Sequence, residues 1–274
     1  FRSMDIWHSA SESDEYLSTG WLGRYLDQEC SGNEKVTAIE IGQILDMALK
    51  GERYKGIALK STEALYRSTR QLNLSEQTSE HELANYLYKT AVSTSSTANY
   101  LYETKKVYQT KREYPQSDFA QQLKEIAELI CSGVESPIYY VSLSGFDTHN
   151  NQEARQGRLL KIYSDAMEAF VADLKAHDQW KNTLMMTFSE FGRRVKQNAS
   201  GGTDHGQANN MIMAGGNLKK QGLYNSLPDL SNLSRGDLKH QIDFRQVYAT
   251  ILDKWLVSDS QTIMNRDFEK LSFI

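Results

Sequence analysis

The stretch SPIYYVSLSG, Ser136 to Gly145, is a nearly continuous apolar run, which is typical of a buried strand. Amphipathic helical patterns flank it: SDFAQQLKEIAELI (117–130) precedes it and RLLKIYSDAMEAFVADLKAH (158–177) follows it. Two further apolar runs and a closing helical pattern come after these, NTLMMTFSEFG (182–192), NNMIMAGG (209–216) and DFRQVYATILDKWL (243–256). Alternating helices and buried strands predict an α/β fold whose sheet is mostly parallel and flanked by helices.

The N-terminal half adds shorter elements to this plan. KVTAIEIG (35–42) and GIALK (56–60) predict two strands bounded by glycines, and Thr19 is the expected N-cap of a helix reaching Glu29. A mainly helical insertion is expected over about 61–114, with a kink or break at the Ser/Thr run near its middle. His81 and Glu82 adjoin there, but no further ligand follows at a metal-site spacing. We expect one domain over 1–274.

Composition excludes several classes of protein. The 274 residues are 39% hydrophobic and 24% charged, as in soluble globular proteins. A net charge of -4 argues against nucleic-acid binding, and no apolar run is long enough to span a membrane. Cys30 and Cys131 could pair but form no disulfide framework. The opening FRSMDIWHSA shows no targeting signal and resembles the middle of a protein, so we expect the domain to be N-terminally incomplete.

Polar residues gather in three loops next to the predicted strands. Asp147 and His149 follow the first strong strand, and Glu190 follows the second. Asp204 and His205 precede the third. Ligands of open α/β sheets bind at the carboxyl ends of strands, and mixed nitrogen and oxygen ligands suit Zn, Mn or a related divalent ion.

Each loop also has a simpler interpretation. Asp147 is typical of an Asx turn, and Glu190 is typical of an acid at a helix N-terminus. Arg193 and Arg194 form either a solvated face or a recognition site for an oxyanion. The occurrence of all three loops in one sheet favours the metal site.

Three segments carry a family resemblance: SGFDTHNNQ (144–152), the long stretch from Met186 to Gly216, and GDLKHQIDFRQVYATILDKWL (236–256). They closely resemble the bacterial family called domain of unknown function 1501, over most of the chain from Ser136 onward. That family looks like a branch of the alkaline-phosphatase-like superfamily, which also contains sulfatases and cofactor-independent phosphoglycerate mutases. The resemblance implies an alkaline-phosphatase-like α/β fold. It also implies a periplasmic or envelope location, because members commonly carry an export signal upstream.

The resemblance also implies a ligand set. Glu190 takes the place of the superfamily's aspartate, and Phe191 takes the place of the histidine that follows it. His205 matches the late histidine ligand, and Asp204 is its neighbour. Asp147 and His149 match the earlier pair of ligands at a shorter spacing. The superfamily's first aspartate and its nucleophile belong to an early strand and helix, so no catalytic nucleophile is assigned in this chain.

Two functions are compatible with these residues. The first is a metal-dependent hydrolase of phosphate or sulfate esters, with Asp147, His149, Glu190 and His205 holding Zn, Mn, Ca or Mg. Arg193, Arg194 and Asp204 would contact a small anionic ester or a sulfated or phosphorylated glycan. The second is a non-catalytic envelope protein of the same fold that binds a glycan, polyanion or protein partner. Phe191 and the unassigned nucleophile favour the second. No Gly-x-Ser-x-Gly motif supports a serine hydrolase.

Overall fold

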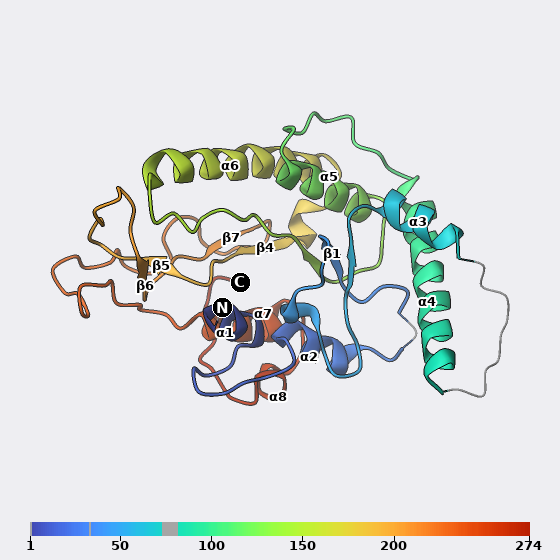
Figure 1. Ribbon diagram of the computed structural model, residues 1–274, viewed down its shortest axis with the longest axis horizontal. Coiled ribbons are helices and arrows are strands. Elements are labelled where there is room, and N and C mark those ends of the chain that lie inside the picture. Colours follow the sequence, from blue (N-terminus) through green and yellow to red (C-terminus); the bar gives the residue numbers. More distant parts are fainter. Residues whose placement is uncertain (1, 33, 73–81) are drawn as a thin grey trace.

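Three short strands form a parallel sheet in the middle of the molecule (Figure 1). The structure is a computed structural model that describes residues 2–32, 34–72 and 82–274. Strand β1 (Ile39–Ile41) lies between β2 (Ile57–Leu59) and β3 (Tyr139–Tyr140) and pairs with both in parallel. The strands predicted over 35–42 and 56–60 are therefore confirmed in shorter form, and so is the central apolar strand, of which two residues pair.

Alternation of side chains along β1 gives the sheet two buried faces. Ile39 and Ile41 point into one apolar cluster, whereas Ala38 belongs to a second. This is the period of two expected for a strand, and it means that helices must cover both faces. Helices do so: α5 (Asp118–Cys131) and α6 (Gln152–Ala176) lie on one side, and α1, α2, α7 and α8 lie on the other (Figure 1).

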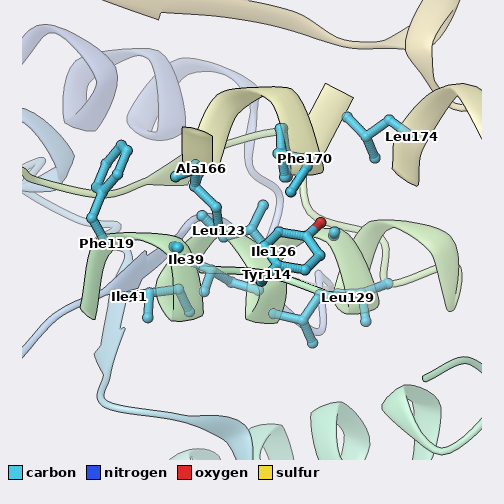
Figure 2. Packing of buried hydrophobic residues seen from close by; sticks show 14 of the residues in the cluster. Ile39, Ile41, Tyr114, Phe119, Leu123, Ile126, Leu129, Ala166, Phe170 and Leu174 are labelled. Atoms are coloured by element: carbon cyan, nitrogen blue, oxygen red, sulfur yellow. The ribbon is translucent and has the colours of Figure 1, made fainter. Parts of the chain in front are cut away.

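Helices α5 and α6 cover the face of Ile39 and Ile41. Phe119, Leu123 and Ile126 repeat along one side of α5 and are buried, as the sequence pattern predicts (Figure 2). The Ser117 hydroxyl accepts a hydrogen bond from the Ala120 amide at 3.3 Å and caps the first turn of α5.

The opposite face is covered by α1 (Arg2–Ser9), α2 (Trp21–Glu29), α7 (Phe244–Lys254) and α8 (Ser260–Met264). Tyr248 of α7 is fully buried, and its ring stacks on Trp21 with centroids 4.2 Å apart. The predicted N-cap at Thr19 is wrong, because Gly20 occupies that position without a side-chain cap. A Cβ on Gly20 would lie 2.1 Å from the Met47 carbonyl oxygen, so this close backbone approach sets where α2 begins. Met47–Leu49 forms the 3₁₀ turn η1.

The remaining strands correct the prediction of a mostly parallel sheet. Strand β4 (Leu184–Thr187) pairs with β7 (Ile212–Gly215), and the two strands run antiparallel. Between them β5 (Gly192–Arg193) pairs antiparallel with β6 (His205–Gly206). A parallel pair needs a crossover, usually a helix, and the segment between β4 and β7 contains only this small hairpin. In the described residues the strands therefore form three separate sheets of a mixed α/β fold.

Helices α3 (Thr62–Arg70) and α4 (Glu82–Lys105) form the helical part of the N-terminal half, and Ser61 caps α3. Helix α4 runs through the Ser/Thr segment without the predicted break. His81 lies outside the described residues. The turn η2 (Trp180–Asn182) connects α6 to β4.

Two further sequence expectations concern the whole chain. Cys30 and Cys131 are free thiols, and burial raises the pKa of both to about 11. Among the described residues, no helix combines the length and apolarity needed to cross a bilayer.

A largely buried ion cluster fixes the end of α4 to α5. The Lys105 ammonium donates to Glu125 and lies 3.1 Å from a carboxylate oxygen of Glu128. The three side chains are 18%, 11% and 9% exposed. Burial is the largest influence and raises the pKa of Glu125, but the Lys105 charge and the hydrogen bonds from Lys105 and Thr62 together outweigh it and leave that pKa lowered.

We expect Lys105→Met to destabilise the fold by about 3 kcal/mol at pH 7, because two buried carboxylates lose their cation. The lowered pKa means that the Glu125 contribution is present above the unfolded value of about 4.3 and is lost as the pH falls further. The difference in melting temperature between Lys105→Met and the unmodified protein should therefore become smaller as the pH is lowered below about 4.3. Lys106→Met is the matched control, because Lys106 pairs with Glu103 on the surface and should not alter melting.

Candidate metal centre

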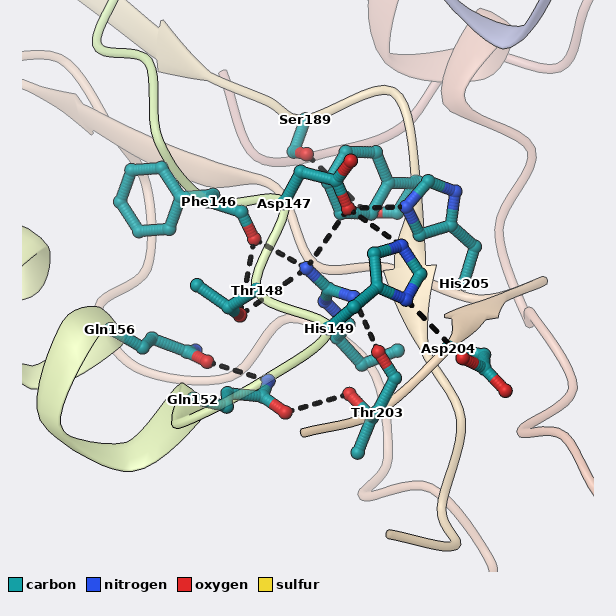
Figure 3. Close-up of polar contacts among 12 residues, drawn as sticks. Phe146, Asp147, Thr148, His149, Gln152, Gln156, Ser189, Thr203, Asp204 and His205 are labelled. Carbon is teal, nitrogen blue, oxygen red and sulfur yellow. Dashed lines mark hydrogen bonds and ion pairs between the residues drawn. The ribbon is translucent and has the colours of Figure 1, made fainter. Parts of the chain in front are cut away.

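Two of the predicted loops bring their histidines to one aspartate. Asp147 and His149 lie in the loop between β3 and α6, and His205 begins β6 (Figure 3). One ligand atom from each of these three side chains lies within 4.8 Å of the others. Asp147 and His205, 58 positions apart in the sequence, thus lie at one point, as the loop pattern predicts.

The cluster is built around one carboxylate oxygen. Asp147 Oδ1 lies 2.8 Å from His205 Nε2 and 3.0 Å from His149 Nε2. The hydrogen bond from His205 is the main reason that the pKa of Asp147 is lowered, with further contributions from His149 and Arg193. The three side chains are 59%, 47% and 48% exposed, so the cluster is open to solvent and ligands.

These donors fit a divalent ion. Ligand atoms of a tetrahedral zinc site with bonds of ~2.0 Å lie roughly 3.3 Å apart, close to the distances around Asp147. Two imidazoles and one carboxylate favour Zn or Mn over Ca and Mg, which prefer oxygen ligands. Three protein ligands also leave room for water or a substrate atom, the arrangement typical of catalytic rather than structural zinc.

Asp204 contacts His149 on the side of the ring that faces away from Asp147. Its Oδ1 lies 3.2 Å from His149 Nδ1, on the opposite side of the ring from Asp147 (Figure 3). A carboxylate at Nδ1 accepts that proton and leaves the Nε2 lone pair free for a metal, which is the usual second partner of a metal-bound histidine. The predicted contact of Asp204 with substrate stays a prediction, but its position is that of a residue orienting His149.

Phe191 orients the other histidine. Its ring stacks on His205 with centroids 4.1 Å apart and an angle of 9° between the planes. The sequence identified Phe191 only as the replacement of a histidine ligand. No pattern in the sequence indicated that the replacement would lie flat against His205.

Arg193 joins the segments that supply the cluster. Its guanidinium donates to the Thr203 carbonyl at 2.6 Å, to the Phe146 carbonyl, and to the Thr148 hydroxyl at 3.3 Å. It also lies 3.6 Å from Asp147 Oδ1. Most of its donors are therefore used inside the protein, and the predicted contact with substrate stays a prediction.

Arg194 and Glu190 lie apart from the cluster. Arg194 pairs with Asp237 at 3.1 Å and donates to the Arg235 carbonyl. Glu190 is half-buried and is not part of the three-residue group. Its charge acts on the pKa values of His8 and Tyr140 instead. The role of Glu190 as a ligand also stays a prediction.

The loop before β6 approaches the cluster closely. A Cβ on Gly202 would lie 2.3 Å from the carbonyl carbon of His149, so only glycine allows this packing. Asn198 completes the contact, since its side-chain amide donates to the His149 carbonyl at 2.9 Å. Gly202 therefore serves the close packing of this loop against the His149 backbone.

A cavity of about 2040 Å³ opens beside the cluster. Asp147, Glu190 and Arg193 line part of it, together with aromatic residues such as Trp7 and Phe188. Its lining mixes polar and apolar side chains, so it can contact both the anionic and the apolar part of a ligand.

We expect Arg193→Gln to weaken zinc binding 10- to 100-fold, because Asp147 and the Thr203 segment lose their shared anchor. Isothermal titration calorimetry with Zn²⁺ measures the change, and a thermal melt checks that the fold persists. Arg194→Gln is the neighbouring control and should bind zinc as the unmodified protein does. Equal affinities of the two variants would show that Arg193 does not position the cluster.

Comparison with known proteins agrees with the family predicted from the sequence. The family model described as Protein of unknown function (DUF1501) matches residues 5–270, which include the whole cluster and its supporting residues. No curated protein and no solved structure matches the chain. The chain belongs to the DUF1501 family of proteins of unknown function.

Proposed function

We propose that this protein is a hydrolase of phosphate or sulfate esters that depends on a divalent metal held by Asp147, His149 and His205. The observation that carries the proposal is the convergence of two Nε2 atoms on Asp147 Oδ1, at 2.8 and 3.0 Å, at the margin of a large cavity. When bound there, a divalent ion would polarise an ester oxygen and promote attack by water or a hydroxyl.

The chain's own residues would prepare this chemistry. Asp204 and Phe191 hold the two imidazoles in position, and Arg193 holds the loop of Asp147. The same arrangement keeps a carboxylate and two imidazole nitrogens facing one point, which reduces the cost of ordering the site. The nucleophile remains unassigned.

The alkaline-phosphatase-like fold and the envelope location belong to this proposal too. A parallel sheet with helices on both faces supports the first. The resemblance of the loops around Asp147, Glu190 and His205 suggests both.

A non-catalytic binding function is the second candidate, and one observation favours it. Phe191 fills the position of a histidine ligand and packs flat against His205. The described residues therefore offer one compact group of metal ligands rather than two. A protein with one such group could hold a glycan or another polyanion without turning it over.

We expect His205→Ala to remove most bound zinc and to lower ester turnover with it, because the site loses one of three ligands. Metal content is measured by mass spectrometry after loading with ZnCl₂. Turnover is measured with p-nitrophenyl phosphate and p-nitrophenyl sulfate. His177→Ala is the control, because His177 lies at the far end of α6 beside Tyr108. Unchanged zinc in His205→Ala would exclude His205 as a ligand, and a metal-free, inert wild type would support the binding function.

We expect Asp204→Asn to lower zinc affinity 10- to 100-fold while the metal stoichiometry at saturation is retained, since only the partner of His149 Nδ1 changes. The same calorimetric titration measures the effect. An affinity equal to that of the unmodified protein would show that Asp204 does not orient His149.

A further inference from the structure

A second polar cluster lies on the wall of the same cavity, at the carboxyl ends of β1 and β3. His8, the penultimate residue of α1, is only 4% exposed, and its Nε2 lies 3.2 Å from the Tyr140 hydroxyl. Asp46 accepts a hydrogen bond from the Ser142 hydroxyl at 3.4 Å. His8, Asp46, Tyr140 and Ser142 all line the cavity that Asp147 also lines. In open α/β sheets this edge is where ligands bind.

One short segment connects the two clusters. Phe188 follows β4, and its ring meets His8 edge-on with centroids 6.3 Å apart. Phe191, three residues later, stacks on His205. Three residues span at most about 11 Å, so the backbones of Phe188 and Phe191 lie close together, and both rings line the cavity that His8 and Asp147 also line.

The surroundings of His8 are acidic. Glu40 is 4% exposed and accepts the Asp46 amide at 2.7 Å, while Glu190 contributes a further carboxylate. Within the described part of the chain, Glu40, Asp46 and Glu190 form no ion pair with a Lys, Arg or His. Of these three carboxylates only Glu40 is buried, and a buried carboxylate without an ion pair is costly, whereas Asp46 and Glu190 are half-buried and their charges act on His8.

These neighbours set the protonation of His8. Burial lowers the pKa of the His8 imidazole, and the positive charge of Lys50 lowers it further. The negative charges of Asp46, Glu190 and Asp5 raise it, but the pKa of His8 remains below its ordinary value. Burial raises the pKa of the Tyr140 hydroxyl well above its ordinary value and raises that of Glu40 to about 7. At neutral pH the imidazole is therefore uncharged and able to accept a proton, beside a hydroxyl that keeps its own.

We propose that His8 is the proton-transferring residue of the active site, acting opposite the Asp147 cluster on the ester that the proposed function hydrolyses. The oxygen of water bonds to phosphorus or sulfur, and one water proton passes to His8. The bond from phosphorus or sulfur to the alcohol oxygen breaks, and that oxygen takes the proton from His8. One water is consumed, and the alcohol and inorganic phosphate or sulfate are released.

The test compares His8→Gln with the unmodified protein, both loaded with zinc, using p-nitrophenyl phosphate. Gln can still bond the Tyr140 hydroxyl but cannot carry the proton. We expect kcat to fall 10²- to 10⁴-fold with little change in KM or zinc content, and the acid limb of the pH profile to disappear. His177→Gln is the control and should match the unmodified protein.

The outcomes separate the two proposals. A zinc-loaded wild type without turnover removes the proposed function and the assignment of His8 with it. Turnover in the wild type with unchanged kcat and pH profile in His8→Gln removes the assignment alone.

If His8→Gln does not fold, an NMR titration of the wild-type protein tests the assignment of His8 instead. Inorganic phosphate bound to the zinc-loaded protein should shift the His8 ring resonance in a proton NMR titration, as contact with the product requires. A His8 resonance that bound phosphate leaves unmoved would overturn the proposal.

Discussion

The contact on which the candidate metal centre depends is the Arg193 guanidinium. It joins the Phe146 and Thr148 segment to the Thr203 segment, while its own strand β5 pairs with β6. A planar group with five donors can satisfy several acceptors at once, which a lysine cannot do. Because Asp147 lies in one of these segments and His205 follows another, the geometry of the cluster is set by this shared anchor.

Much of the fold can be predicted from the sequence because burial on both faces leaves a clear pattern. The apolar side of α5 and the caps at Ser117 and Ser61 follow from local spacing and hydrogen bonding. The antiparallel direction of β4 and β7 does not follow from local spacing, because it depends on how the chain between the two strands turns back. Likewise α2 begins after Gly20 because of a contact with the distant Met47 backbone.

The candidate site likewise contains residues that the sequence predicts and contacts that it does not. Asp147, His149 and His205 could be found because each lies in a polar loop next to a predicted strand, although the strands belong to separate sheets. Their supporting contacts could not: Phe191 was interpreted as a lost ligand, and its stacking on His205 is a matter of tertiary packing. His8 carried no signal in the sequence, because its partner Tyr140 is 132 positions away. Chemistry-bearing loops leave motifs, whereas pairs between distant elements do not.

Phe191 lines the cavity and stacks on His205, so it connects the Asp147 cluster with the cavity that His8 lines. Phe191 contributes no ligand, so in the described residues the compact donor group serves one ion. In a two-metal site the second ion would stabilise the attacking or leaving oxygen without proton transfer. With one ion, the leaving oxygen has no second metal to stabilise it, and a proton from a side chain can take over that task. His8, buried beside Tyr140 and reached through Phe188, is placed to do so. On the proposed function, the phenylalanine at 191, where the superfamily resemblance implies a histidine, and the buried His8 in the same cavity are two parts of one chemical solution.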